Sequence, residues 1–170
     1  THHFALRVLT YDALLKWKRR LTDLDIVVDG PFDRHYFTSI YFRDPDGTIV
    51  EIATDGPGWM VDEAAAALGQ ALREPPAEMV VRNRDAARIA ALTWPEPVPA
   101  ITADMALAEG MHHITAIASD IERTNAFLVE TLGLRRVKMT ANFDDPDSAH
   151  WYWGVGDGAP GTLITYFERK

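Results

Sequence analysis

The strongest constraint on the fold of this chain is an internal repeat, because one order of expected elements occurs near both ends. Each copy reads as a strand, a helix and three further strands, over residues 1–58 and 111–170. The fourth expected strands of the two copies align without gaps: Gly47-Thr48-Ile49-Val50-Glu51 matches Gly161-Thr162-Leu163-Ile164-Thr165. A repeat of this kind indicates two similar units that share one core. We therefore predict a single α+β domain in which two βαβββ units pair into a curved mixed β-sheet.

The first copy has clear element boundaries. Alternation and helical spacing predict a strand over 3–9, a helix over 11–21, and strands over 26–28, 35–43 and 48–54. Asp29-Gly30-Pro31 has strong turn chemistry, and Asp44-Pro45-Asp46-Gly47 is typical of a hairpin turn. The order in this copy is therefore βαβββ.

The second copy follows the same order. We expect a strand over 113–118, a helix over 120–132 capped by Asp120, and strands over 135–143, 149–155 and 162–167. The two copies are joined by a linker over 59–110, where Ala-rich and apolar stretches predict helices at 61–72 and 83–92. We expect this helical linker to cover the mouth of a site between the units.

Composition limits the class of ligand. A net charge of −8 and a pI near 5.1 argue against nucleic-acid and anionic membrane partners, and no apolar run reaches the length of a membrane span. The chain has no cysteine, so any metal is held by His, Asp and Glu, which suits Fe(II), Mn(II) or Zn(II). We expect a cytoplasmic location.

Two His-His pairs and one glutamate form the candidate metal site. His2-His3 and His112-His113 each open an apolar strand, and Glu51 lies inside another. Because alternate strand residues share a face, His3, Glu51 and His113 all point to the side that helix packing leaves open. Two histidines and one carboxylate can form a facial metal triad, which predicts a metal-dependent oxygen enzyme around a metal cavity.

A simpler interpretation exists for each of these residues alone. A single strand histidine is commonly a hydrogen-bonded core residue, and Glu51 by itself could be a surface carboxylate of an edge strand. The second unit has Thr165 at the position of Glu51, and a threonine is a poor ligand for a divalent ion. This would leave three protein ligands and open coordination positions.

Several stretches carry a family resemblance. They include Met111-His112-His113-Ile114-Thr115-Ala116-Ile117, Asn142-Phe143-Asp144-Asp145-Pro146, Tyr41-Phe42-Arg43-Asp44-Pro45 and Val50-Glu51-Ile52-Ala53-Thr54-Asp55-Gly56-Pro57-Gly58. They resemble the vicinal oxygen chelate (glyoxalase/bleomycin-resistance/extradiol dioxygenase) superfamily, and within it the ring-cleaving dioxygenases of hydroquinones. Full-length relatives are about twice as long and carry these units in the reverse order. In this chain, the unit that resembles the last family unit comes first, and a new linker joins it to the unit that resembles the first.

The resemblance implies a function and a set of site residues. His3, Glu51 and His113 would hold Fe(II), with Mn(II) or Zn(II) as alternatives, for ring cleavage of a small aromatic diol by O₂. His2, His112, Thr115, Arg34 and Tyr41 match residues beside the ligands or the substrate. His2, His112 or Tyr41 would handle the phenolic proton, and Arg34 would stabilise negative charge. His150 and Trp151 either line the cavity or pack in a strand. The family also implies a homodimer.

Three other classes stay open. A glyoxalase-type isomerase or thiol transferase would use the same fold with Ni(II), Zn(II) or Mn(II), but it usually has four protein ligands, and Thr165 counts against it. A non-catalytic small-molecule-binding protein would not need both histidines and Glu51 on inner faces. The reversed order is also compatible with an artificial or vestigial rearrangement that binds metal and turns over poorly.

Overall fold

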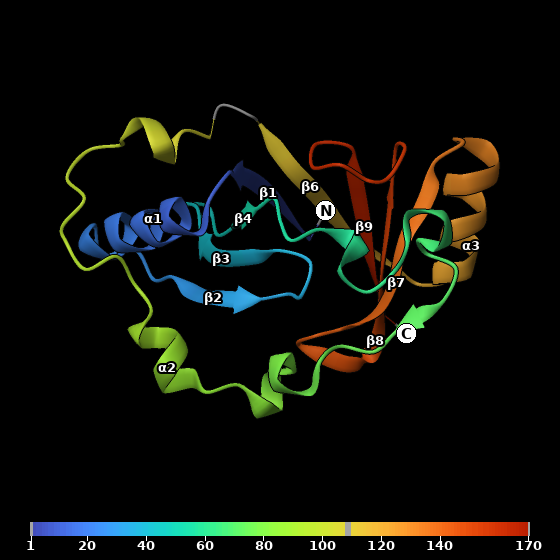
Figure 1. The fold of residues 1–170 in the computed structure, drawn as a ribbon, viewed down its shortest axis with the longest axis horizontal. Coiled ribbons are helices and arrows are strands. Elements are labelled where there is room, and N and C mark those ends of the chain that lie inside the picture. Colours follow the sequence, from blue (N-terminus) through green and yellow to red (C-terminus); the bar gives the residue numbers. More distant parts are fainter. Residues whose placement is uncertain (1, 108–109, 170) are drawn as a thin grey trace.

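One nine-stranded mixed sheet forms the framework of the protein (Figure 1). The structure is a computed structural model that describes residues 2–107 and 110–169. The strands are β1 (His3–Val8), β2 (Asp29–Asp33), β3 (Thr38–Arg43), β4 (Ile49–Thr54), β5 (Leu72–Arg73), β6 (Met111–Ala118), β7 (Arg135–Asn142), β8 (Asp145–Gly154) and β9 (Leu163–Glu168), in the spatial order β2-β3-β4-β1-β6-β9-β8-β7-β5. The predicted α+β class with a mixed sheet is confirmed.

The two repeat copies meet at the centre of the sheet. Strand β1 runs parallel to β4, β6 runs parallel to β9, and β1 and β6 pair antiparallel between them. Ala5 of β1 lies opposite Glu51 on one side and opposite His113 on the other. His3 lies two residues away on β1, so alternation places its side chain on the same face as Ala5. The register therefore gathers the three expected metal ligands on three adjacent strands.

Two helices pack against the strands at opposite ends of the molecule (Figure 1). Helix α1 (Tyr11–Asp23) begins after Thr10, whose hydroxyl accepts a hydrogen bond from the Ala13 amide, and buries Leu14 and Leu21. Helix α3 (Ile121–Ala126) begins after Asp120 and continues as a π-helical turn, Phe127–Thr131. Ile121 and Leu128 pack there with Trp151 and Trp153 of β8. These contacts occupy one face of β1 and β4 and of β8 and β9, and they leave the opposite face for the site.

The first copy differs from its predicted elements at its second strand. Residues 26–28 form no strand, and β2 instead spans Asp29–Asp33, where we expected a turn. Because β2 is the edge strand of the sheet, Pro31 needs no amide hydrogen bond on its free side. Gly30 has a φ of 103°, and a Cβ there would lie 2.7 Å from the Ser39 carbonyl oxygen. The glycine thus serves close strand pairing rather than a turn.

The linker is less helical than expected. Residues 61–72 contain the last residue of the 3₁₀ turn Trp59–Val61, the 3₁₀ turn Ala65–Ala67 and the start of β5, so the predicted helix there is wrong. Tertiary contacts override the helix propensity of this Ala-rich stretch: Glu63 is buried against Lys138, and a Cβ at Gly69 would collide with the Arg136 carbonyl oxygen. Helix α2 (Ala86–Ala91) confirms the core of the second expected helix. Ala108 and Glu109, at the end of the expected linker, lie outside the described residues.

The linker also contains the 3₁₀ turns Trp59–Val61, Ala77–Met79, Val81–Asn83 and Ala103–Met105.

The linker is held to the first copy through its backbone carbonyl groups. Lys18 of α1 is buried and donates to the carbonyl oxygens of Ile89, Ala90 and Leu92 at 2.7–3.1 Å. Such bonds satisfy the unpaired carbonyls at the C-terminal end of α2. The linker therefore follows the outside of α1 as a fixed segment (Figure 1).

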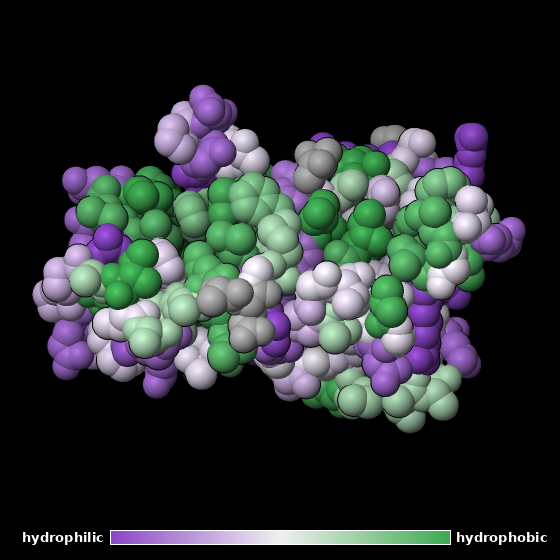
Figure 2. Space-filling view, turned by 90° about the horizontal axis from the view of Figure 1, so that it is seen from above, coloured by the Kyte–Doolittle hydropathy of each residue, from purple (hydrophilic) through white to green (hydrophobic). Residues whose placement is uncertain are grey.

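The surface hydropathy and the helix lengths are relevant to whether the chain could cross a membrane. Figure 2 shows hydrophobic side chains across both halves of the face seen from above, with hydrophilic side chains mainly around its rim. Among the described residues, none of the helices has both the length and the apolar character that a bilayer crossing would require.

Candidate metal centre

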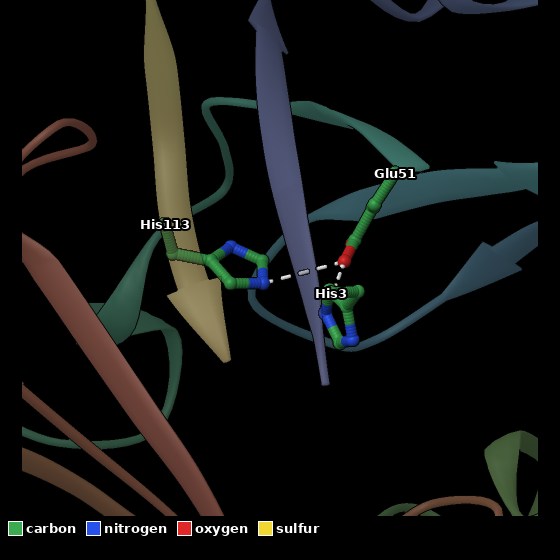
Figure 3. A group of neighbouring side chains, drawn as sticks. All are labelled: His3, Glu51 and His113. Carbon is green, nitrogen blue, oxygen red and sulfur yellow. Dashed lines mark ion pairs between the residues drawn. The ribbon is translucent and has the colours of Figure 1, made fainter. Parts of the chain in front are cut away.

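His3, Glu51 and His113 converge from three neighbouring strands (Figure 3). The Nε2 atom of His3 lies 2.9 Å from Oε2 of Glu51, and the Nε2 atom of His113 lies 3.3 Å from the same oxygen. The three potential ligand atoms all lie within 4.8 Å of one another, and all three side chains are buried. Each residue thus presents a lone-pair-bearing atom to one shared point.

Glu51 is the side chain that most needs a cation. It is fully buried, and neither of its carboxylate oxygens has a hydrogen-bond partner within the described residues. The Nε2 atoms of His3 and His113 lie close to Oε2 as ion-pair contacts. An unsatisfied buried carboxylate is costly, whereas a divalent cation at the point of convergence would satisfy it. The residues present therefore fit a bound metal ion.

The ionisation of Glu51 suits this role. Burial alone would raise its pKa, but the imidazoles of His113 and His3 beside it hold the pKa well below the ordinary value. The side chain is therefore an anion at neutral pH, as a metal ligand must be. The group can bind a metal, and its donor set is compatible with Fe(II), Mn(II) and Zn(II) alike.

The first histidine of each pair orients the second. The Nδ1 atoms of His2 and His3 lie 2.8 Å apart, and those of His112 and His113 lie 2.9 Å apart. Burial, with His113 next to it, lowers the pKa of His112 to about 4, so this ring is neutral at pH 7. A neutral partner at Nδ1 fixes the ring orientation that turns Nε2 toward the centre. His112 and Thr115 do not line the cavity, whereas His2 does.

The cavity beside the triad has a volume of about 640 Å³. Its walls are mainly aromatic and aliphatic, and they include Phe32, Phe37, Phe143 and Phe167. Such a size and lining are typical of a site for a small organic ligand. The cavity is therefore better suited to an apolar ring than to a sugar or a phosphate ester.

Arg34 and Tyr41 supply polar groups on the wall of this cavity. The guanidinium carbon of Arg34 lies 5.3 Å from the centre of the Tyr41 ring, and that ring lies 5.9 Å from the ring of His3. Burial is the main cause that raises the pKa of Tyr41, so the phenol stays protonated. Its hydroxyl accepts a hydrogen bond from Ser39 at 3.1 Å. The structure thus places Tyr41 beside His3, with Arg34 beyond Tyr41 on the same cavity wall.

A series of hydrogen-bonded side chains lies on the opposite wall of the cavity. The sequence alone did not decide whether His150 lines the cavity or packs in its strand. The Tyr152 hydroxyl is 2.9 Å from His150 Nδ1, His150 Nε2 is 2.9 Å from the Thr165 hydroxyl, and Thr165 is 2.9 Å from Thr115. Burial lowers the pKa of His150 well below its ordinary value, so its imidazole is neutral. His150 and Tyr152 both line the cavity, while Trp151 packs on the other face of β8. Strand alternation from His150 was the signal that could have separated these neighbours.

Comparisons with known proteins give partial matches. Residues 1–52 match the family described as the Glyoxalase/Bleomycin resistance protein/Dioxygenase superfamily. The chain is 52% identical over 59 residues to the "Putative ring-cleaving dioxygenase MhqE" of Bacillus subtilis (strain 168), a match that covers 35% of this chain and 20% of that protein. It is 43% identical over 63 residues to the chlorohydroquinone/hydroquinone 1,2-dioxygenase of Sphingobium indicum, covering 36% of this chain and 20% of that protein.

A solved structure extends the likeness to the fold. The crystal structure of a protein titled a putative dioxygenase from Bacillus subtilis superposes with a TM-score of 0.55 at 16% identity, over 97% of this chain and 39% of that one. At this identity the likeness concerns the fold alone. The matches to the curated relatives span about a fifth of those proteins' length. The homology is therefore partial.

Proposed function

We propose that this chain, whose residues 1–52 belong to the Glyoxalase/Bleomycin resistance protein/Dioxygenase superfamily, is an Fe(II)-dependent dioxygenase that opens the ring of hydroquinone-type aromatic diols with O₂. The observation that carries the proposal is the buried, unsatisfied Glu51 between two histidines at the wall of an aromatic cavity. A bound Fe(II) would supply a place where the diol and O₂ meet and exchange electrons. Mn(II) and Zn(II) remain alternatives for the same ligands.

The cavity side chains divide the remaining work. The phenyl rings of Phe32, Phe143 and Phe167 exclude water and hold an aromatic ring by apolar contact. Arg34, a permanent cation, pairs with a substrate oxygen as that oxygen becomes negative. Tyr41 stays protonated and donates a hydrogen bond to an oxygen in the cavity. These groups select a planar ring that bears oxygen substituents.

Proton transfer falls to histidines that are neutral at pH 7. Burial lowers the pKa of His2, which lines the cavity and lies 2.8 Å from His3. His150 is neutral as well and lies on the opposite wall. A neutral imidazole beside the substrate can accept a phenolic proton and return it later. His112 and Thr115 lie behind the wall, and we assign them the orientation of His113 and Thr165.

Thr165 supports this function over a four-ligand isomerase. Its hydroxyl is already shared between Thr115 and His150, both at 2.9 Å. Three protein ligands leave coordination positions free for two exogenous molecules, which a reaction between a diol and O₂ requires.

The test is metal content measured together with oxygen consumption. The chain is loaded anaerobically with Fe(II), desalted, and divided between elemental analysis and an oxygen electrode with hydroquinone or chlorohydroquinone. About one iron per chain with substrate-dependent oxygen uptake supports the proposal, and samples loaded with Mn(II) or Zn(II) show which ion is active. Bound metal without oxygen uptake on any aromatic diol would overturn the dioxygenase assignment, and the absence of bound metal would overturn the site.

We also propose that the chain is one vicinal oxygen chelate domain, with units 1–58 and 111–170, that forms a homodimer. Ile114 and Ile117 of the central strand β6 are 42% and 43% exposed, which is unusual for apolar residues in the middle of a sheet. Light scattering on a chain of 19.0 kDa separates a dimer from a monomer directly.

A further inference from the structure

A second charged cluster lies on the cavity wall, away from the triad. Asp144 pairs with two arginines, through Oδ2 with Arg34 at 2.9 Å and through Oδ1 with Arg84 at 2.6 Å. Both guanidinium groups also stack on Phe32, at 5.1 Å and 4.7 Å from the ring centre. The three charged groups sum to one net positive charge beside an apolar cavity.

Arg84 differs from the other members because it belongs to the linker and does not line the cavity. Its Nε atom donates to the Met79 carbonyl oxygen at 2.8 Å, and its remaining donors reach Asp144 and the Phe143 carbonyl oxygen. The side chain is only 9% exposed. Arg84 is thus held by Met79 on one side and by Phe143 and Asp144 on the other. Phe143 and Asp144 line the cavity, and Arg84 lies behind them.

We propose that Arg84 is a positioning residue, which keeps the Arg34 guanidinium turned into the cavity to bind the anionic oxygen of an aromatic ligand. The inference rests on the proposed function for the identity of the natural ligand. The geometry itself concerns only how two arginines share one carboxylate.

The reason lies in the preference of a guanidinium for both oxygens of a carboxylate. Arg84 occupies Oδ1 of Asp144, so Arg34 is restricted to Oδ2 and keeps other N–H groups for a ligand. Without Arg84, both oxygens of Asp144 become available to Arg34, which can then turn toward the carboxylate in a two-bond pair. This turn of Arg34 away from the cavity weakens anion binding.

The charge and the shape of a ligand can be separated with two probes of similar size. At pH 8, 4-nitrophenolate is an anion, whereas 4-nitroanisole is neutral, and both bind without O₂ turnover. Dissociation constants are measured by quenching of intrinsic fluorescence in the metal-free protein. Failure of the dioxygenase proposal would therefore leave this measurement intact.

We expect Arg84→Met to weaken 4-nitrophenolate binding about tenfold and to change 4-nitroanisole binding less than twofold. Arg84→Lys keeps a cation beside Asp144 but cannot reach all three acceptors, so it should fall between the wild type and Arg84→Met. Arg82→Met, at an exposed neighbouring position of the same 3₁₀ turn, is the matched control and should leave both constants unchanged.

A double-variant cycle tests whether Arg84 acts through Arg34. In an Arg34→Met background, adding Arg84→Met should change 4-nitrophenolate binding less than twofold, because the group that Arg84 positions is gone. Equal weakening of both probes in Arg84→Met would show a collapsed wall and overturn the proposal. A full tenfold loss in the Arg34→Met background would overturn it too. If Arg84→Met does not fold, Arg84→Lys carries the same comparison.

Discussion

The two halves of the sheet use the same strand position for opposite purposes. In β4 this position is Glu51, a fully buried carboxylate between two histidines that has no hydrogen-bond partner in the described part of the chain. In β9 it is Thr165, also fully buried, whose hydroxyl is shared by Thr115 and His150. One half therefore has an unmet need for a cation, and the other has a satisfied polar network. Both copies thus supply a histidine, but only the first copy supplies a carboxylate ligand.

The largest expected effect comes from removing the charge in the first half. Glu51→Gln keeps the shape of the side chain but replaces a carboxylate ligand by a weak amide, so we expect retained metal to fall at least about tenfold and activity to disappear. Elemental analysis after desalting measures this loss. The metal-free variant should melt no lower than the metal-free wild type, since it no longer buries an unpaired charge. One metal ion per chain in Glu51→Gln would break the comparison.

The buried cation of the second half should matter for stability alone. Lys138 of β7 is fully buried and pairs with Asp62 at 2.6 Å and with Glu63, both from the linker. Lys138→Met leaves these carboxylates without their cation, which should cost about 3 kcal/mol of the free energy of unfolding. Urea denaturation measures this cost. Retained metal should stay at the wild-type level in the folded fraction, and a loss like that of Glu51→Gln would contradict a purely structural role.

Thr165 provides the direct counterpart to Glu51. Thr165→Val removes a hydroxyl that bonds to two buried groups, so we expect a loss of about 1–3 kcal/mol in the free energy of unfolding. Metal content should not change, because Thr165 is not among the ligands. If metal is lost together with stability, Thr165 contributes to metal binding and the contrast between Glu51 and Thr165 is wrong.

The smallest expected effect is a dependence of stability on acid pH. Burial alone would raise the pKa of Asp62, but hydrogen bonds from Lys138 and Tyr36 bring the pKa below its ordinary 3.8. A lowered pKa in the folded state means that this ionised group stabilises the protein above about pH 4. That contribution disappears as the pH falls through the folded-state pKa. Urea midpoints between about pH 5 and pH 2 should therefore fall more steeply in the wild type than in Asp62→Asn. Parallel curves would exclude Asp62 as a source of acid sensitivity.

Much of the fold could be predicted because its signals are local. Alternation placed β4 and β6 within two residues at each end, and alternation also placed His3, Glu51 and His113 on one face. The signals failed where distant contacts decide. The stretch 61–72 has the composition of a helix, but burial of Glu63 beside Lys138 prevents one.

The candidate site shows the same limit. The ligand histidines could be inferred from their strands, whereas the shared use of Asp144 by Arg34 and Arg84 could not. It depends on where the linker passes behind the cavity wall, and no periodic pattern encodes this. The sequence did not decide whether His150 lines the cavity or packs in the core, because β8 has buried side chains on both faces.

The pairing of β1 with β6 has a consequence for how the protein is made. His3 lies opposite Thr115, so the central ladder joins residues about 110 positions apart along the chain. Closing a loop of this length costs conformational entropy before the contacts can repay it. The three candidate ligands therefore come together only once β6 has been made, and a shorter nascent chain has no complete site to fill. Metal uptake would thus report on the pairing of the central ladder, and a metal ion bound there would slow unfolding by holding this ladder closed.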